Sequence, residues 1–314
     1  MLRACFVSVR GCLRSAFAGI RSAPEALNVM PPFLTLISPW EFSPTVLTCC
    51  VGSGVLYVGG LRQRRREGLT TGFARTFSFF VGLLLFYVAL QTYVDYLSQH
   101  MFWVHRVQHL VLHHLAPLLV VLAAPHEVMG RGLPERLRRR VLLPLWRRGP
   151  LHVVYRVVQN PFVASLLFAG LIYFWLIPSV HFDAMLSAPR YKLMNWSMVV
   201  DGLLFWWLIV DPRPPAEHRM PTYPTRILML FVVMILQIGI GAPIALSRSV
   251  LYTAYSVCGR AWPISPLVDQ EIGGLTTWIP AAMMSVIGIL IVLRLWMRQS
   301  VRDGDAMAAA ARAD

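Results

Sequence analysis

Residues 100–125 have the sequence HMFWVHRVQHLVLHHLAPLLVVLAAP, a long apolar run into which histidines are inserted. A helix of roughly 20 apolar residues crosses the hydrocarbon core of a bilayer. Because backbone polar groups in hydrocarbon must be paired within their own segment, such a run has to form a helix. The stretch therefore predicts an all-α fold whose helices span a membrane.

The composition of the whole chain supports the same fold. Apolar residues make up 56% of the chain and charged residues only 14%, with a mean hydropathy of +0.57. A soluble domain is usually about one quarter charged. We expect a polytopic transmembrane helical bundle with about seven spans, at 44–61, 74–96, 102–124, 156–177, 193–210, 226–247 and 275–296.

The arginines alternate between the predicted loops. They are concentrated after the first, third and fifth spans and in the C-terminal tail, whereas the intervening loops contain few. Since Lys and Arg are retained on the cytoplasmic side, this pattern predicts an N-out/C-in topology. The net charge of +14 thus reflects topology, and the arginines form no patch interleaved with aromatic residues that would indicate nucleic-acid binding.

The chain divides into a lead, a membrane domain and a tail. Residues 1–37 are either an upstream extension, with Met30 as the true start, or a disordered lead. Residues 38–298 form the seven-helix domain, and 299–314 a cytoplasmic tail. Within the domain, residues 127–150 alternate arginines with apolar residues, which suits a helix lying on the anionic inner leaflet. A solvated basic loop is the alternative.

The histidines of the third span are the main functional candidates, because polar groups inside a membrane are costly. At helical spacing Met101, His105, His109 and His113 form one stripe, and His114 points elsewhere. His105 and His109, four residues apart, could bind one metal ion together. His113 lies about 12 Å along the axis from His105 and would support the site.

Imidazole combined with thioether or carboxylate donors suits copper, and zinc less selectively. We expect Met101 or Asp269 as a third ligand, with Asp95 and His100 on the same outer side in support. Asp201, the deepest acid, should face the interior and pair with a histidine of the third span, or bond to a neighbour on its own helix.

Two other interpretations of these histidines remain open. Haem is a rival cofactor, but no histidine outside the third span lies within a predicted span, which disfavours ligation by two histidines. The histidines could also hold the bundle together through interhelical hydrogen bonds without binding any metal.

Three segments carry a family resemblance: the third-span stretch quoted above, GLLFWWLIVDPRPP at 202–215, and DQEIGGLTTW at 269–278. In order and spacing they resemble the CtaG-type family of cytochrome c oxidase assembly factors, associated with caa-type oxidases. The resemblance implies a multi-pass protein of the bacterial plasma (inner) membrane. It also implies a haem–copper oxidase subunit as partner, a role at the copper centres of that oxidase, and no established catalytic activity.

Residue by residue, the resemblance marks His105, His109, His113, Asp269 and Gln270. One departure concerns the fifth span, where many members have a histidine in a segment like L-M-H. This chain has Leu193-Met194-Asn195 there, so a copper site that needed that histidine would be absent.

We therefore expect an assembly factor for cytochrome c oxidase that binds or delivers copper at an outward-facing histidine site. A copper permease is the first alternative, although LAPLLVVLAA at 115–124 offers no further ligand for an inward path. A scaffold that stabilises an oxidase intermediate without metal is the second. We expect no enzyme, because no nucleophile–base pair or nucleotide-binding loop is present in the sequence.

Overall fold

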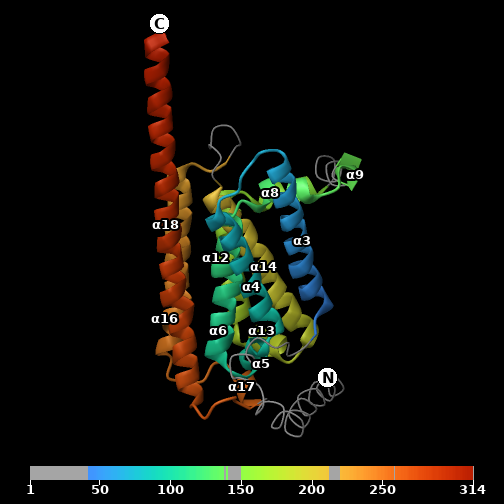
Figure 1. Ribbon diagram of the computed structural model, residues 1–314. Coiled ribbons are helices and arrows are strands. Elements are labelled where there is room, and N and C mark those ends of the chain that lie inside the picture. Colours follow the sequence, from blue (N-terminus) through green and yellow to red (C-terminus); the bar gives the residue numbers. More distant parts are fainter. Residues whose placement is uncertain (1–41, 138, 141–149, 212–219, 258, 314) are drawn as a thin grey trace.

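The computed structural model describes residues 42–137, 139–140, 150–211, 220–257 and 259–313. Every regular element in these ranges is a helix, and the helices pack as one bundle (Figure 1). Five helices are long and apolar enough to cross a membrane, and up to seven spans result if each of two bent helix pairs counts as one. The predicted all-α polytopic fold is confirmed. The predicted lead, 1–37, lies outside the described residues.

Each predicted span coincides with helix. The long helices are α3 (Pro44–Arg66), α4 (Phe73–Gln91), α6 (Phe102–Leu110) continuing through η1 (Val111–Leu115) into α7 (Ala116–Leu122), α12 (Pro161–Leu176), α14 (Ala188–Val210), α16 (Tyr223–Leu246) and α18 (Pro266–Ala313). Shorter helices connect them: α5 (Tyr93–His100), α8 (Pro125–Gly132), α9 (Glu135–Leu137), α11 (Pro150–Val158), α13 (Pro178–Met185) and α17 (Ala254–Val257).

Some helix ends differ from the predicted span ends, and a helix-capping residue explains the clearest case. The fourth span begins at Pro161 and not at 156, because the Asn160 side chain accepts hydrogen bonds from the N–H groups of Phe162 and Val163. A cap of this kind starts a new helix, and the preceding α11 is bent by 77° from α12. In the predicted tail, 299–314, α18 continues as a helix to Ala313 and projects beyond the bundle (Figure 1). A cytoplasmic position of this segment stays a prediction.

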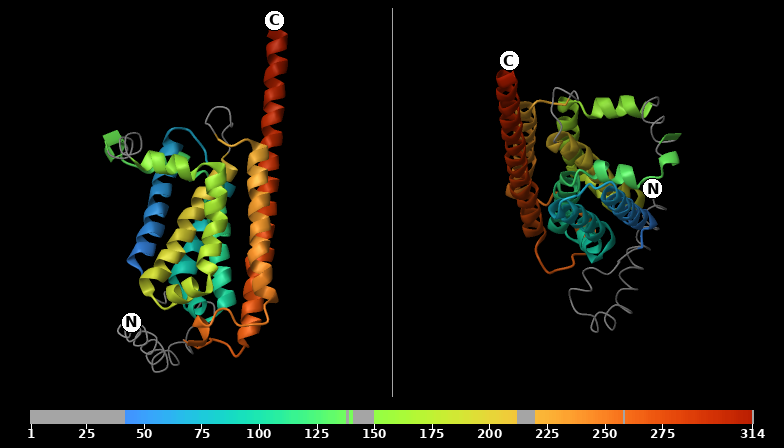
Figure 2. Two further views of the ribbon diagram at one scale, coloured as in Figure 1. Left: turned by 180° about the vertical axis from the view of Figure 1, so that it is seen from behind. Right: turned by 45° about the horizontal axis from the view of Figure 1, so that its top comes forward.

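The two ends of the bundle differ in the short helices and in the arginines that lie there. Helices α8 and α9 and the C-terminal half of α18 lie at one end, and α5, α13 and α17 lie at the other (Figures 1 and 2). Arg64, Arg65 and Arg66 close α3 at the first of these ends, where Arg131 of α8 also lies. These described arginines, from the loops after the first and third predicted spans, therefore lie at one end, as the alternation predicts. Which side of a membrane that end faces stays a prediction.

The basic segment 127–150 is described only in part, because residues 138 and 141–149 lie outside the described ranges. Its first part belongs to α8, which is bent by 69° from the preceding span. A short helix turned across the end of the bundle is compatible with the predicted interfacial position. Contact with anionic lipid stays a prediction.

The third span is irregular in its middle. Pro117 lacks the N–H that would bond to the His113 carbonyl in an α-helix. The chain there widens into the π-helix η1, in which the Ala116 N–H bonds to the Val111 carbonyl. On α14, Gly202 lies against the same region, and a Cβ at this position would be only 2.5 Å from the His113 oxygen. The missing side chain of Gly202 thus lets α14 approach the widened turn.

Because of this close approach, we expect alanine substitutions at two glycines to differ in their effect on stability. Gly202→Ala should lower the free energy of unfolding by about 1–3 kcal/mol, because the added methyl group overpacks a backbone contact. Gly170→Ala on α12 is the matched control, since a Cβ there would meet no atom within 4 Å. Thermal unfolding of the purified variants in detergent measures both. Equal melting temperatures for the two variants would show that α14 does not depend on this contact.

Candidate functional site

His105 and His109 form a buried imidazole pair on α6. The exposed fractions of the two residues are 0% and 2%, and their ring centroids lie 4.3 Å apart at an interplanar angle of 44°. Neither ring nitrogen of His105 has a hydrogen-bond partner; the Ser98 backbone lies near the ring without reaching hydrogen-bond geometry. The predicted proximity of these two side chains is confirmed.

The partner of His109 determines which of its nitrogens is available. Its Nε2 lies 3.1 Å from Oδ1 of Asn195 on α14, at the position where the sequence departs from the family pattern. With the amide oxygen facing the ring, Nε2 carries the proton and Nδ1 keeps a lone pair. Nδ1 has no hydrogen-bond partner. Buried polar atoms are nearly always paired, so the unpaired nitrogens of His105 and His109 are chemically suited to hold a metal ion.

His113 and His114 lie in the π turn, and both are buried. His113 Nε2 is 2.8 Å from Oδ2 of Asp201, which confirms the predicted pairing of that acid with the third span. His114 points in a different direction, toward α16, where its Nε2 lies 3.0 Å from the amide nitrogen of Gln237. These contacts link helices in the way expected of structural histidines.

Met101 does not belong to the histidine stripe. It is the residue before α6, with an extended backbone (φ −139°, ψ 123°), so four-residue helical spacing does not relate it to His105. Its side chain is fully buried and packs with Leu97 and Val104. The predicted thioether ligand is therefore part of an apolar cluster at the start of the span.

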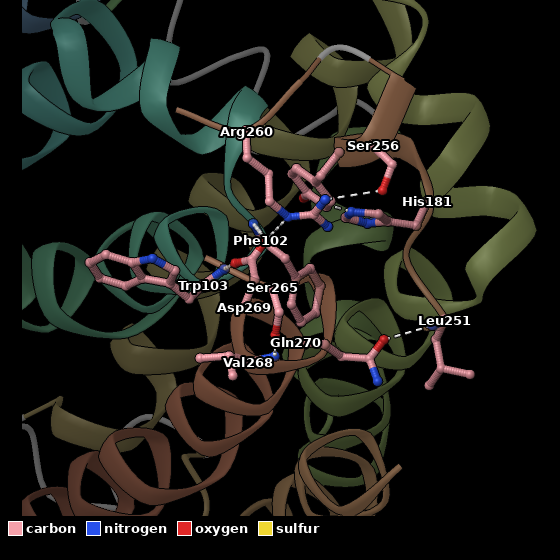
Figure 3. A network of polar contacts seen from close by, with 11 residues as sticks. Phe102, Trp103, His181, Leu251, Ser256, Arg260, Ser265, Val268, Asp269 and Gln270 are labelled. Atoms are coloured by element: carbon pink, nitrogen blue, oxygen red, sulfur yellow. Dashed lines mark hydrogen bonds and ion pairs between the residues drawn. The ribbon is translucent and has the colours of Figure 1, made fainter. Parts of the chain in front are cut away.

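Asp269 caps α6 (Figure 3). Its Oδ2 accepts a hydrogen bond from the Phe102 N–H at 3.1 Å, and its Oδ1 accepts one from the Trp103 N–H at 3.0 Å. Arg260 Nε lies 3.3 Å from Oδ2 and completes an ion pair. The first N–H groups of a helix need such partners, and a carboxylate also suits the positive end of the helix dipole. Both oxygens are thus engaged, and the structure favours capping over the predicted metal ligation.

Gln270, the other residue that the resemblance marks on α18, also bonds to backbone. Its Oε1 accepts a hydrogen bond from the Leu251 N–H at 2.6 Å (Figure 3). Its Nε2 donates to the Ser249 carbonyl at 3.0 Å. Gln270 thereby holds the segment after α16 against the first turn of α18.

The two remaining supporting residues take structural partners. Asp95 Oδ1 accepts hydrogen bonds from Tyr191 Oη and from Gln108 Nε2, each at 2.8 Å, which connects α5, α6 and α14. His100 is half-buried, and its Nδ1 bonds to the Tyr96 carbonyl in the preceding turn. Both lie near the start of the third span as predicted, but their hydrogen bonds serve packing.

His181 on α13 is a contributor that sequence reasoning assigned only to a loop. It is fully buried, and its ring lies 5.2 Å from that of His105 at 89°. Its nitrogens pair with the Trp175 carbonyl and the Tyr255 hydroxyl. Burial, together with the nearby Arg106 charge, lowers the pKa of His181 to about 3, so the ring stays neutral at physiological pH. His181 therefore packs against the imidazole pair without adding positive charge.

The pair is an incomplete metal site. Among the described residues, no three His, Cys, Asp or Glu side chains are placed to share an ion. What the geometry offers is two imidazoles with free lone pairs, enclosed by His181, Tyr191 and Tyr255, whose ring centroids lie within 6.5 Å of that of His105.

A capping role for Asp269 predicts a fold defect on its removal. Asp269→Ala should cost about 1–2 kcal/mol of stability, because two helix N–H groups and Arg260 lose their partner. Glu271→Ala, a neighbouring exposed carboxylate, is the control and should be nearly neutral. Thermal unfolding compares the two. If Asp269→Ala melted like the control but lost bound copper, Asp269 would be a ligand and not a cap.

Comparisons with known proteins agree with this fold and these motifs. Residues 55–299 match the family described as cytochrome c oxidase caa3 assembly factor. Uncharacterised proteins of Mycobacterium bovis and Mycobacterium tuberculosis are each 28% identical over 288 residues, and one of Mycobacterium leprae is 26% identical over 281. These matches cover 87% of this chain but only 41% of each relative, so the chain spans about two fifths of their length. No solved structure matches. The chain belongs to the caa3 (CtaG-type) cytochrome c oxidase assembly factor family.

Proposed function

We propose that this protein assists the assembly of a caa3-type cytochrome c oxidase by holding copper between His105 and His109. The observation that carries the proposal is the buried pair of rings 4.3 Å apart, whose lone pairs find no partner within the described residues. Imidazole nitrogen is a good copper ligand, and leaving such atoms unpaired in a bilayer interior is otherwise costly.

The incomplete donor set fits delivery better than storage. A closed site with four protein ligands retains its metal, whereas a site with open positions can exchange ligands. Two imidazoles leave positions for a donor from the copper source or from the oxidase subunit. His105 is fully buried beneath α13 and α17, so loading and release require these short helices to move.

We place the protein in the bacterial plasma membrane with the pair toward the outer side. The His105 ring lies against His181 of α13 and Tyr255 of α17. These two helices lie at the end of the bundle opposite α8 and α9 (Figure 1). Retention of arginine in the cytoplasm supports this orientation. Copper and the oxidase subunit would then approach from the same side.

Of the two alternatives, the permease has less support. Arg106 lines the cavity below His109, and a fixed positive charge there opposes the passage of a cation. The scaffold has support from the bonds of His113 to Asp201 and of His114 to Gln237, which link helices without metal. It leaves the free nitrogens of His105 unexplained.

Removal of the two imidazoles tests the proposal. The double variant His105→Ala/His109→Ala should bind cuprous copper at least roughly 10-fold more weakly than the wild type, because both proposed ligands are gone. His100→Ala is the matched control, since its ring bonds within its own helix. Competition with a cuprous chelator measures affinity, and the copper content of purified oxidase measures function. If the double variant is present at normal abundance and the oxidase still contains its normal amount of copper, the copper proposal is wrong and the scaffold alternative is favoured.

The bond from Asn195 to His109 yields a second prediction. Asn195→Leu should weaken copper binding about 10-fold, because the ring loses the acceptor that fixes its orientation and its Nδ1 lone pair. Asn195→Asp keeps an acceptor at this position and should retain the affinity. Melting temperatures of both variants report on folding separately. Equal affinities of the Leu and Asp variants would contradict a positioning role for Asn195.

A further inference from the structure

Arg106 is a buried charge without an acidic partner. Its exposed fraction is 4%, its Nε donates to the Thr277 hydroxyl at 3.1 Å, and its Nη1 has no hydrogen-bond partner. A guanidinium stays protonated in proteins, so the positive charge cannot be lost on burial. Charges inside a membrane domain are almost always paired. Arg106 therefore requires a negative group that the described residues do not supply.

Three carboxylates of the bundle interior are already engaged. Asp201 pairs with His113, Asp269 pairs with Arg260 and the start of α6, and Asp95 accepts bonds from Tyr191 and Gln108. None of the three forms an ion pair with Arg106. The nearby hydroxyls of Tyr252 and Tyr255 are neutral and bond to the Leu176 carbonyl and His181.

A cavity adjoins the guanidinium. It has a volume of about 20 Å³, which is more than the roughly 10–15 Å³ that one water molecule needs. Its polar lining consists of Arg106, His109, His113, His114, Gln237, Thr276 and Thr277. Several polar atoms of these side chains are buried without a partner, among them Arg106 Nη1 and the Nδ1 atoms of the three histidines.

The hydrogen bonds indicate which lining groups donate. His114 Nε2 accepts from the Gln237 amide, so its Nδ1 carries the proton and is a donor. Arg106 Nη1 is a donor in every state. The cavity thus combines a fixed positive charge with a second N–H group, a combination that binds anions. Gln237 Oε1 and the Nδ1 atoms of His109 and His113 are acceptors in the same lining, so the anion would lie on the side of Arg106 and His114.

We propose that this cavity is a binding site for a small monovalent anion, held by Arg106 and His114. The limited volume admits an ion such as chloride or formate and excludes a large organic anion such as gluconate. The site shares no proposed ligand with copper, because neither Arg106 nor His114 is a proposed copper ligand.

The anion also has a consequence that rests on the proposed function. His109 lines the cavity and belongs to the copper-binding pair, so a bound anion would offset the charge of a copper ion held there. Binding of the two ions should then be mutually favourable, since linkage acts equally in both directions.

Thermal unfolding at constant ionic strength tests the anion site. Wild-type protein transferred from sodium gluconate into chloride or formate should show a saturable rise in melting temperature, because an ion that binds only the folded state stabilises it. Arg106→Gln should lose this rise. Arg190→Gln, which removes an exposed arginine paired with Asp183, should retain it. A wild type that melts identically in all three salts, or an Arg106→Gln variant that responds like the wild type, would overturn the proposal.

A direct measurement covers the case in which Arg106→Gln does not fold. Equilibrium dialysis of copper-free wild-type protein with radioactive chloride should show one saturable site that formate displaces and gluconate does not. Absence of saturable binding would refute the site. Copper affinity measured in formate and in gluconate then tests the coupling; formate is used because chloride itself complexes cuprous copper. Saturable anion binding without any copper binding would reject the copper function and leave the anion site intact.

Discussion

The bonds from the Asp269 carboxylate to the first N–H groups of α6 determine where the third span begins. Unpaired backbone groups are costly in hydrocarbon, and α6 starts abruptly at Phe102 after the extended Met101. Asp269, in the first turn of α18, supplies both acceptors and a negative charge at the positive end of the helix. The depth and rotation of His105 and His109 therefore depend on a residue more than one hundred and fifty positions away.

The features that could be predicted from the sequence are those that the bilayer imposes locally. Hydrophobic runs identify spans, because no other backbone arrangement satisfies its hydrogen bonds in hydrocarbon. Asp201 could be assigned to the bundle interior, with a third-span histidine as one of two expected kinds of partner, because an isolated acid in this environment is too costly. His105 and His109 could be placed side by side, because α6 is regular between them.

Features that depend on distant segments could not be predicted. Pro117 signals a lost hydrogen bond, but a kink and a π turn are both possible responses. The close approach of Gly202 to the His113 carbonyl accompanies the π turn, and it comes from another helix. The burial of His181 requires α13 to fold against α6, and no local pattern in residues 178–185 indicates this. The burial of Arg106 against Thr277 of α18 likewise depends on a distant helix, and no local pattern indicates it.

The order of charges along the third span distinguishes holding an ion from conducting one. On the inner side of an ion held by His105 and His109 lies the positive charge of Arg106. Further inward are groups that already have hydrogen-bond partners: His114, His113 and Asp201. A pathway for cations would instead need acceptors or negative charges at successive depths. Asp201 cannot serve as one while it is bonded to His113. On the proposed function, copper therefore enters and leaves by the same end of the bundle, which is the behaviour required of a protein that hands its cargo to a neighbouring subunit.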